Sequence, residues 1–255
     1  MGTTQARVAV LSDIHGNRWA LEAVLADAGR RGLRDMVNLG DTVYGPLDPA
    51  GTADILLGLG IPTVRGNQDR AILEGAGTAD SPSMRFVRDR LRKGHLTWLA
   101  GLESTLAVFD ALFLCHGTPQ LDTEYLLSDV RESGVVVREP AGLEARTSDV
   151  RQPVVLCGHD HAPRTARLPS GKLVVNPGSV GLPAFTSETP YPHAMETGTP
   201  HARYSVICRG EAGWLVEDIA VPYEWDAASH VAMEHGRPDW AGWLATGRAA
   251  AGQHA

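Results

Sequence analysis

The sequence predicts an α/β fold, because short apolar runs rich in β-branched residues alternate with helix-like segments near the N-terminus. Polar residues follow directly after several of these runs, as they do at the ligand-binding edge of an α/β sheet. The chain has 255 residues, of which 43% are hydrophobic and 21% are charged, so it can bury a sizeable core. No internal repeat, linker or charge block divides it, and we expect a single domain over residues 1–255.

The alternation is clearest in the first third of the chain. Arg7–Ser12 is apolar and β-branched, which is typical of a strand buried on both faces. A helix should follow, because Asn17 can cap it and apolar residues from Leu21 to Ala28 recur at helical spacing. The next elements are expected to be a strand at Met36–Leu39, a helix at Pro49–Leu59 and a strand at Ile61–Val64.

In the rest of the chain, turn residues separate the predicted strands. Asp110, Pro169–Gly171 and Gly210–Gly213 each lie between two apolar runs, which favours hairpins at these three places. The predicted strands are Ser104–Val108, Ala111–Cys115, Val154–Cys157, Arg164–Leu168, Lys172–Asn176, Tyr204–Cys208 and Trp214–Ile219. Helices are expected at Ser83–Arg92, His95–Ala100 and Thr123–Arg131, and two short amphipathic segments follow Glu224. Residues 186–201, rich in Thr, Pro and His, are expected to form a mobile loop.

Charge and cysteine content indicate which binding partners and which compartment to expect for the protein. The formal net charge of −7 opposes general binding to nucleic acid or to an anionic membrane. No apolar run approaches the roughly 18 residues of a membrane span, and Met1–Arg7 has no features of an export signal. Cys115, Cys157 and Cys208 each end an apolar run, as buried reduced thiols do, so we expect a cytoplasmic protein.

Five polar clusters follow apolar runs along the chain. They are Asp13–Asn17, Gly40-Asp41, Gly66–Asp69, His116-Gly117 and Gly158–His161. Strand carboxyl ends open onto the ligand crevice of an α/β sheet, so we expect the five clusters to converge. Their carboxylates, imidazoles and amide suit two divalent ions about 3.5–4 Å apart, an arrangement that is used on phosphate esters.

Each cluster alone also has an ordinary structural explanation. Asn17 and Asp69 can cap helices, Gly40-Asp41 can form a turn, and His116 can be a buried, hydrogen-bonded histidine. Five such clusters in this order after apolar runs are hard to explain by chance. Together they favour a metal site.

The order Asp-x-His, Gly-Asp, Gly-Asn-x-Asp, His-Gly and Gly-His-x-His resembles the calcineurin-like metallophosphoesterase superfamily. The segments GDTVYGPLDP, VRGNQDRAIL and NPGSVGLP are similar to its small bacterial and archaeal phosphodiesterase branch. The resemblance covers roughly Arg7–Pro183 and continues weakly through Ala202–Ile207. It implies a two-sheet αββα sandwich with the metal site at the carboxyl-terminal edge of the strands.

The resemblance also implies a role for each motif residue. Asp13, His15 and His161 would hold the first metal ion, Asp41 would bridge both ions, and Asn67, His116 and His159 would complete the second site. We expect two divalent ions, with manganese first and iron, zinc, nickel or cobalt as alternatives. The implied reaction is an in-line attack on phosphorus by a metal-bridging hydroxide, without a phospho-enzyme.

Gln68 departs from the family pattern, since many members have histidine after the Gly-Asn pair. An amide can donate a hydrogen bond to a phosphate but cannot transfer a proton to a leaving group. We therefore expect small phosphodiester or phosphoanhydride substrates whose leaving groups depart readily. Asp41, Asn67 and Gln68 are the expected catalytic residues, and Gln68 and Asn17 the expected substrate contacts.

Two kinds of residue outside the motifs are weighed as well. His193 or His201 could replace the missing acid, although a solvent-exposed histidine in a loop is the more common case. The tryptophans lie mostly in apolar patterns and are interpreted as packing residues; they are Trp19, Trp98, Trp214, Trp225, Trp240 and Trp243.

Three functions stay open. The leading one is a dinuclear phosphodiesterase, and the second is a dinucleoside polyphosphate hydrolase or a nucleotide or protein phosphatase with the same metal site. The third is a non-catalytic scaffold of the metallophosphoesterase type, which is disfavoured because all seven donor residues are present. The expected partner is a small phosphate-ester substrate, and we expect neither general nucleic-acid binding nor membrane binding.

Overall fold

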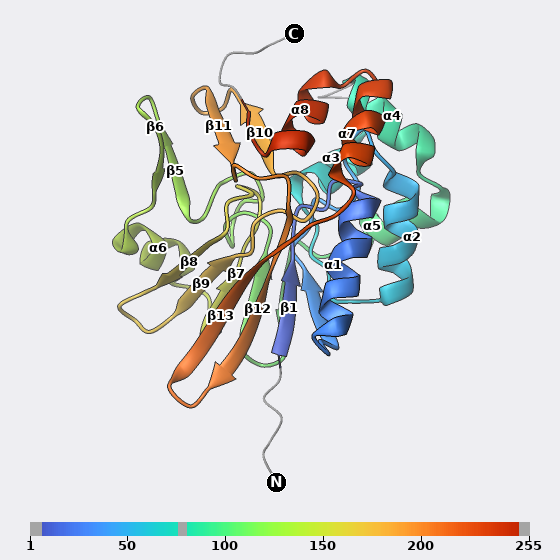
Figure 1. Ribbon diagram of the computed structural model, residues 1–255. Helices are drawn as coiled ribbons and strands as arrows, with labels where there is room; N and C mark the ends of the chain where they lie inside the picture. The colour runs from blue at the N-terminus through green and yellow to red at the C-terminus, as the bar shows by residue number, and fades with distance from the viewer. Residues whose placement is uncertain (1–6, 76–80, 250–255) are drawn as a thin grey trace.

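Two mixed β-sheets pack face to face in the computed structural model, which describes residues 7–75 and 81–249 (Figure 1). The first sheet contains β1 (Arg7–Leu11), β2 (Asp35–Asn38), β12 (Ala202–Gly210) and β13 (Gly213–Val221), in the order β13-β12-β1-β2. The second contains β3 (Thr105–Val108), β4 (Leu112–Cys115), β7 (Val154–Leu156), β8 (Arg164–Arg167) and β9 (Leu173–Asn176), in the order β3-β4-β7-β9-β8. Two separate hairpins are β5 (Ser128–Arg131) with β6 (Gly134–Val137), and β10 (Ala184–Ser187) with β11 (His193–Glu196).

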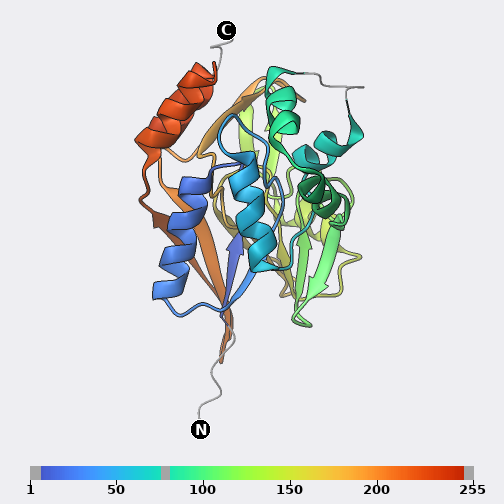
Figure 2. The ribbon, with the colours of Figure 1, turned by 90° about the vertical axis from the view of Figure 1, so that its right-hand side faces the viewer.

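Helices cover the outer faces of this pair of sheets. They are α1 (Arg18–Arg30), α2 (Pro49–Leu59), α3 (Asn67–Glu74), α4 (Pro82–Arg90), α5 (Lys93–Ala100), α6 (Pro140–Thr147), α7 (Trp225–Glu234) and α8 (Pro238–Thr246). Helices α1 and α2 lie side by side, and α7 and α8 lie near one end of the strands (Figure 2). None of the helices in the described part of the chain combines the length and the apolar character that a bilayer span requires.

Strand β1 shows why this sequence forms a layered core. Val8 and Val10 face the second sheet and pack with Leu114 and Leu156, whereas Ala9 and Leu11 face α1. Side chains alternate between the two faces of a strand, so a strand with both faces covered needs an apolar run without alternation. The αββα sandwich implied by the resemblance is confirmed.

Two predicted elements are wrong, and one helix was not predicted. Thr123–Arg131 is not a helix, because Ser128–Arg131 pairs with the β-branched segment at Gly134–Val137. Ile61–Val64 contributes only an isolated bridge, between Asn38 and Thr63. Helix α6 has no counterpart in the prediction.

Residues 186–201 are not an irregular loop throughout. Phe185 pairs with Met195, and Ser187 pairs with His193, so residues 186–196 belong to the β10–β11 hairpin. Local composition misses this pairing, because a Thr- and Pro-rich stretch matches the signal for a loop. The mobility of the segment stays a prediction.

The parallel strands end at one edge of the sandwich. β1 and β2 run parallel in one sheet, and β4, β7 and β9 run parallel in the other. Helix α8 packs against β10, and both lie beyond the carboxyl end of β1 (Figure 1). The C-terminal helices and the β10–β11 hairpin therefore cover this edge.

Candidate metal centre

The structure brings the seven proposed ligands together at this edge. Asp13 and His15 follow β1, Asp41 follows β2, Asn67 is the first residue of α3, His116 follows β4, and His159 and His161 follow β7. The expected convergence of the strand ends is therefore observed. Six of these residues form two clusters of three, each with ligand atoms within 4.8 Å of one another.

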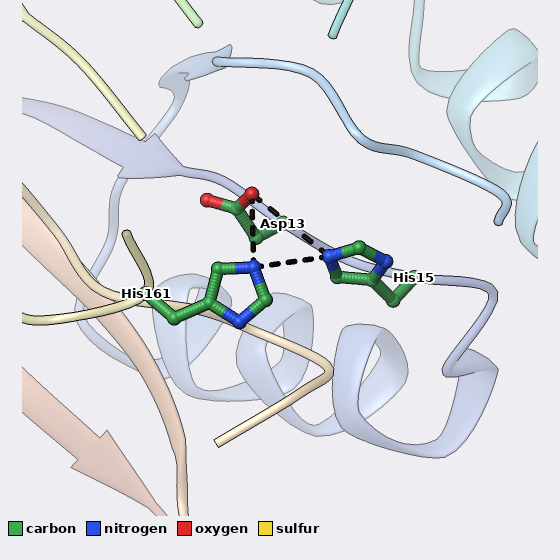
Figure 3. Close-up of side chains that lie close together, drawn as sticks. All are labelled: Asp13, His15 and His161. Atoms are coloured by element: carbon green, nitrogen blue, oxygen red, sulfur yellow. Dashed lines mark hydrogen bonds and ion pairs between the residues drawn. The ribbon is translucent and has the colours of Figure 1, made fainter. Parts of the chain in front are cut away.

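The first cluster consists of Asp13, His15 and His161 (Figure 3). The Nε2 atom of His161 lies 3.3 Å from Asp13 Oδ1 and 3.1 Å from His15 Nε2. The Nε2 atom of His15 lies 3.9 Å from the same Asp13 oxygen. Three potential ligand atoms thus face a common point.

The second cluster consists of Asp41, His116 and His159, with Asn67 beside it. His116 Nε2 lies 3.4 Å from Asp41 Oδ2 and 3.0 Å from Asn67 Oδ1. Asp41 Oδ2 is also 3.9 Å from His15 Nε2, which belongs to the first cluster. Asp41 therefore lies between the two clusters, at the position of a bridging carboxylate.

Backbone carbonyls orient three of the histidines. His15 Nδ1 bonds to Tyr44 O at 3.0 Å, His116 Nδ1 to Leu39 O at 2.8 Å, and His161 Nδ1 to Leu182 O at 2.7 Å. A carbonyl can only accept, so in each neutral ring Nδ1 carries the proton and Nε2 presents a lone pair. This is how proteins commonly orient histidines that bind metal ions.

These lone pairs fit a cation between them. Two neutral imidazoles cannot hydrogen-bond to each other when both Nε2 atoms lack a proton, yet His15 and His161 place theirs 3.1 Å apart. Asp13 Oδ1 is buried and has no hydrogen-bond partner among the described residues. A buried, unpaired carboxylate oxygen is costly, and a metal ion would satisfy it.

The charges of the cluster agree with this arrangement. Burial lowers the pKa of His15 and of His159 to about 4, so both are neutral at pH 7. His116 is also buried, but the charge of Asp41 outweighs burial and raises its pKa to about 10. The raised pKa reflects the attraction between a cationic His116 and the buried carboxylates, and a bound metal ion would supply that positive charge instead and leave His116 neutral, with its Nε2 lone pair free.

Most of the ligands have a left-handed backbone conformation. Among the described non-glycine residues, seven have positive φ angles, and five of these are proposed ligands. They are Asp13 (53°), His15 (53°), Asp41 (51°), His159 (72°) and His161 (55°). Such conformations cost roughly 1–3 kcal/mol each and concentrate at functional sites.

Glycines in the motifs let the loops approach one another. A Cβ atom on Gly66 would lie 2.1 Å from Asp41 Oδ1, and one on Gly158 would lie 2.0 Å from Ser12 Oγ. Any side chain at either position would displace a loop that carries ligands. This explains why glycine precedes Asn67 and His159.

The Asp69 carboxylate hydrogen-bonds to both the loop that carries Asp41 and the loop that carries Asn67. Its Oδ1 accepts hydrogen bonds from the backbone N–H of Thr42 at 2.9 Å and from the Thr42 hydroxyl at 2.7 Å. Its Oδ2 accepts from the backbone N–H of Gly66 at 3.0 Å. Burial and the charge of Asp41 raise the pKa of Asp69 to about 6. In the sequence, Asp69 is predicted only as a helix cap, and Thr42 carries no signal of a role.

Asp160 braces the loop after β7 in the same way. Its carboxylate accepts hydrogen bonds from Ser128 Oγ at 2.7 Å and from Asn176 Nδ2 at 2.7 Å. Asp160 is the middle residue of the Gly-His-x-His motif, so its position next to two ligands was the available signal.

The comparisons with known proteins agree with this geometry. The model of the calcineurin-like phosphoesterase superfamily domain matches residues 7–197. The chain belongs to this superfamily. The uncharacterized protein MJ0912 of Methanocaldococcus jannaschii is 24% identical over 264 residues, which cover 93% of this chain and 96% of the relative.

Two solved structures are similar over nearly the whole chain. A metallophosphoesterase from Sphaerobacter thermophilus is 25% identical with a TM-score of 0.74, and the match covers 95% of this chain and 100% of that one. The hypothetical protein PH1004 from Pyrococcus horikoshii is 19% identical with a TM-score of 0.73, covering 96% and 99%. At 19% identity, the match to PH1004 shows a shared fold alone.

Two cavities adjoin the metal centre of this calcineurin-like phosphoesterase. The smaller, of about 200 Å³, is lined by five of the proposed ligands and by aromatic side chains that include Tyr44, Phe185, Trp240 and Trp243. The larger, of about 540 Å³, includes Glu124, Ser128, Asp129 and Ser187 in its lining. The residues common to both linings are Asn67, Gln68, His159, Phe185 and Thr186.

Gln68 lies where the superfamily motif predicts a substrate contact. Its side chain lines both cavities, and its backbone N–H donates to Asp41 Oδ1 at 2.9 Å. The same backbone bond orients the carboxylate between the clusters.

Asn17 uses its side chain inside the protein. Its Oδ1 accepts from Ala20 N at 3.1 Å and caps α1, while Nδ2 donates to Gly181 O at 2.9 Å and to Tyr223 Oη at 3.1 Å. Asn17 lines neither cavity. The capping role is confirmed, and the structure offers no support for the expected contact with substrate.

The two candidate replacement acids also lie outside both linings. His193 is buried, and its Nε2 lies 3.0 Å from the hydroxyl of Tyr125. His201 lies against Trp225, with ring centroids 5.4 Å apart. Neither histidine supplies an acid at the metal centre in this structure.

Proposed function

We propose that the protein is a dinuclear metal-dependent phosphodiesterase that hydrolyses small phosphodiester or phosphoanhydride substrates. Superfamily membership and the two ligand clusters support phosphoester hydrolysis in general. The preference for diesters rests on the two cavities beside the metal centre.

A phosphodiester carries two organic groups on phosphorus, whereas a monoester carries one. A phosphoryl group beside Asn67 and His159 would have one cavity for each substituent, because both residues line both cavities. The linings differ in their residues, with aromatic rings in the smaller and Glu124 and Asp129 in the larger, so the two substituents are expected to differ too. A monoester would leave one of the cavities without a substrate group.

Asp13, His15 and His161 would hold one ion, and Asn67, His116 and His159 would hold the other, with Asp41 between them. Two divalent ions bound there would lower the pKa of a shared water molecule and neutralise charge on the phosphoryl oxygens. Carboxylate, imidazole and amide donors suit manganese, iron, zinc, nickel and cobalt. We expect manganese first and the other four as alternatives.

Gln68 would donate a hydrogen bond from its side-chain amide to a phosphoryl oxygen. It cannot protonate a leaving group. Tyr125 lines the larger cavity, but its hydroxyl is engaged with His193, and burial raises its pKa. The site therefore suits leaving groups that depart without a proton, such as phosphates and acidic alcohols or phenols.

A phosphoanhydride that joins two nucleosides is a second candidate, because it too carries two organic groups. Hydrolysis of nucleotide or protein monoesters is favoured less by the paired cavities. A non-catalytic scaffold is favoured least, since it needs none of the seven donors. Cys115 and Cys157 are buried thiols that form no disulfide among the described residues, which supports the proposed cytoplasmic location.

The test is a rate comparison on bis(p-nitrophenyl) phosphate and p-nitrophenyl phosphate. The protein is stripped of metal and reloaded separately with Mn, Fe, Zn, Ni or Co, and metal binding is measured by calorimetry. We expect metal-dependent hydrolysis that favours the diester. A preference for the monoester, or no hydrolysis of either ester by protein that has bound metal, would contradict the proposal.

The matched variants are Asp41→Asn and Asp110→Asn. Asp41 and Asp110 both have positive φ angles, of 51° and 58°, but Asp110 is exposed in a turn between β3 and β4. We expect Asp41→Asn to abolish hydrolysis and Asp110→Asn to leave it unchanged. Equal effects would mean that the loss does not come from the metal centre.

A further inference from the structure

We propose that the smaller cavity binds a planar aromatic group of the substrate, so that nucleoside-containing phosphodiesters are the substrate class. This inference rests on the proposed function, because it assigns one of the two substituents on phosphorus. It concerns Tyr44, Phe185, Trp240 and Trp243, which line the cavity beside the metal ligands.

The four aromatic rings come from three separate parts of the chain. Tyr44 follows Asp41, Phe185 lies on β10, and the two tryptophans lie one helical turn apart on α8. The ring centroids of Trp240 and Trp243 are 6.2 Å apart, and those of Trp240 and Tyr44 are also 6.2 Å apart. Trp240 is thus in ring contact with both Tyr44 and Trp243, and Phe185 lines the same cavity; we call these four rings the aromatic wall.

The aromatic wall lies directly against the first ligand cluster. The Trp240 ring centroid is 5.8 Å from that of His15, and the Phe185 ring centroid is 4.5 Å from that of His161. A group attached to a phosphate at the metal centre would therefore meet aromatic surface on this side. The larger cavity has Glu124 and Asp129 in its lining instead, paired with Arg146 and Arg138.

The exposure of each ring distinguishes a residue that packs in the core from residues whose rings are open to a ligand. Trp240 is only 3% exposed and is part of the core that joins α8 to the rest of the protein. Tyr44, Phe185 and Trp243 are only partly buried, although all three line the cavity. Aromatic surface that stays open inside a cavity is available for stacking with a planar group.

The cavity size argues for a compact ring system. Its volume of about 200 Å³ is below the roughly 300 Å³ at which sites for complete drug-sized ligands begin. A long alkyl chain would not fit within it. The remaining part of the substrate would extend past Gln68 into the larger cavity, because Gln68 lines both.

Arg237 also lines the smaller cavity. Its guanidinium donates to the two oxygens of Asp239 at 2.9 and 2.6 Å, and it lies 5.5 Å from the Trp240 ring centroid. The charge of Arg237 is thus balanced within the protein, so the cavity keeps its aromatic character. Helix α8 lies beyond residues 7–197, so Trp240 and Trp243 are outside the matched superfamily domain, whereas Tyr44 and Phe185 are within it.

The test compares the binding of two phosphate probes that differ only by a base. Adenosine 5′-monophosphate and ribose 5-phosphate are titrated into the metal-loaded protein by calorimetry. We expect the nucleotide to bind about tenfold more tightly, the size of one base-stacking contact. The Trp243→Leu variant should lose most of that ratio, and Trp214→Leu, at the start of β13 and outside both cavity linings, should retain it.

Tyr44→Leu provides a second variant in case Trp243→Leu does not fold, which circular dichroism reports. An unchanged affinity ratio in the folded variants, or equal binding of the two probes to the wild type, would overturn the inference. Hydrolysis of bis(p-nitrophenyl) phosphate by the same preparations reports the proposed function separately. Diester hydrolysis without base preference would reject the aromatic subsite alone, and base preference without hydrolysis would reject the phosphodiesterase alone.

Discussion

The Nε2 atoms of His15 and His161 lie 3.1 Å apart and face the same carboxylate oxygen of Asp13. Both rings are fixed from behind, because each Nδ1 donates to a backbone carbonyl. The two lone pairs cannot turn away without loss of those hydrogen bonds. The geometry of this cluster therefore suits a bound cation.

Removal of metal should lower the stability of the protein. Ions that bind only the folded state stabilise it, by about 2.7 kcal/mol for each site when the free ion is at 100 times its Kd. We expect a chelator to lower the midpoint of thermal unfolding and manganese to restore it. Scanning calorimetry measures both changes. An unfolding midpoint that does not respond to metal would contradict the assignment of the centre.

Replacement of Asp69 by asparagine should weaken the metal centre without removing a ligand. The amide nitrogen of asparagine would face either the two donors of Thr42 or the N–H of Gly66, so the loops of Asp41 and Asn67 would separate. Changes behind metal ligands typically cost 10–100-fold in metal affinity or activity. Calorimetric titration with manganese measures the affinity, with Asp110→Asn as the control. An affinity equal to that of the control would show that Asp69 is only a helix cap.

Gln68→His should change the response of the enzyme to leaving groups. A histidine at this position could supply general-acid catalysis, which is typically worth roughly 10²–10⁴-fold, and poor leaving groups should gain most. We expect the rate ratio between diester and monoester to fall in the variant. Rates on aryl phosphates of graded leaving-group acidity provide the measurement. An unchanged diester-to-monoester ratio would refute the proposed role of Gln68.

Asn17→Ala should reduce stability and spare substrate binding. The substitution removes the cap of α1 and the bonds to Gly181 and Tyr223, and loss of a cap alone costs about 1 kcal/mol. Urea unfolding measures the loss of free energy, and steady-state kinetics well below the unfolding midpoint measures KM. A selective rise in KM would restore Asn17 as a substrate contact.

Acid should weaken the link between α1 and β12. Burial opposes the charge of Asp27, but hydrogen bonds from Tyr204 and Arg31 outweigh burial and hold its pKa below the usual value of 3.8. A depressed pKa contributes stability above pH 3.8 that is lost as the pH falls through the folded-state pKa. We expect Asp27→Asn to be less stable than the wild type at pH 7, and the difference to shrink towards pH 3. Urea unfolding at several pH values measures it, and a constant difference would contradict the linkage.

Much of the metal centre could be predicted from sequence because its signals are local. Each ligand lies within a few residues of an apolar strand, and the parallel strands carry these loops to one edge. Asp13 and His161 are 148 positions apart, yet each belongs to a short motif that identifies it. The bracing bonds of Asp69 and Asp160 also come from motif residues, but only coordinates reveal their partners, Thr42 and Ser128.

The sequence by itself determined the α/β class, most of the strands and the ligand set, because periodicity and motif spacing act over a few residues. Only the tertiary structure decided that Ser128–Arg131, within the predicted helix, is a hairpin strand, since pairing with Gly134–Val137 outweighs local helix preference. It also decided the two cavities beside the candidate metal centre. Trp240 and Trp243 look like packing residues in the sequence, and only the docking of α8 against the centre brings Trp240 beside His15. Such contacts depend on the packing of distant surfaces, which no short stretch of sequence encodes.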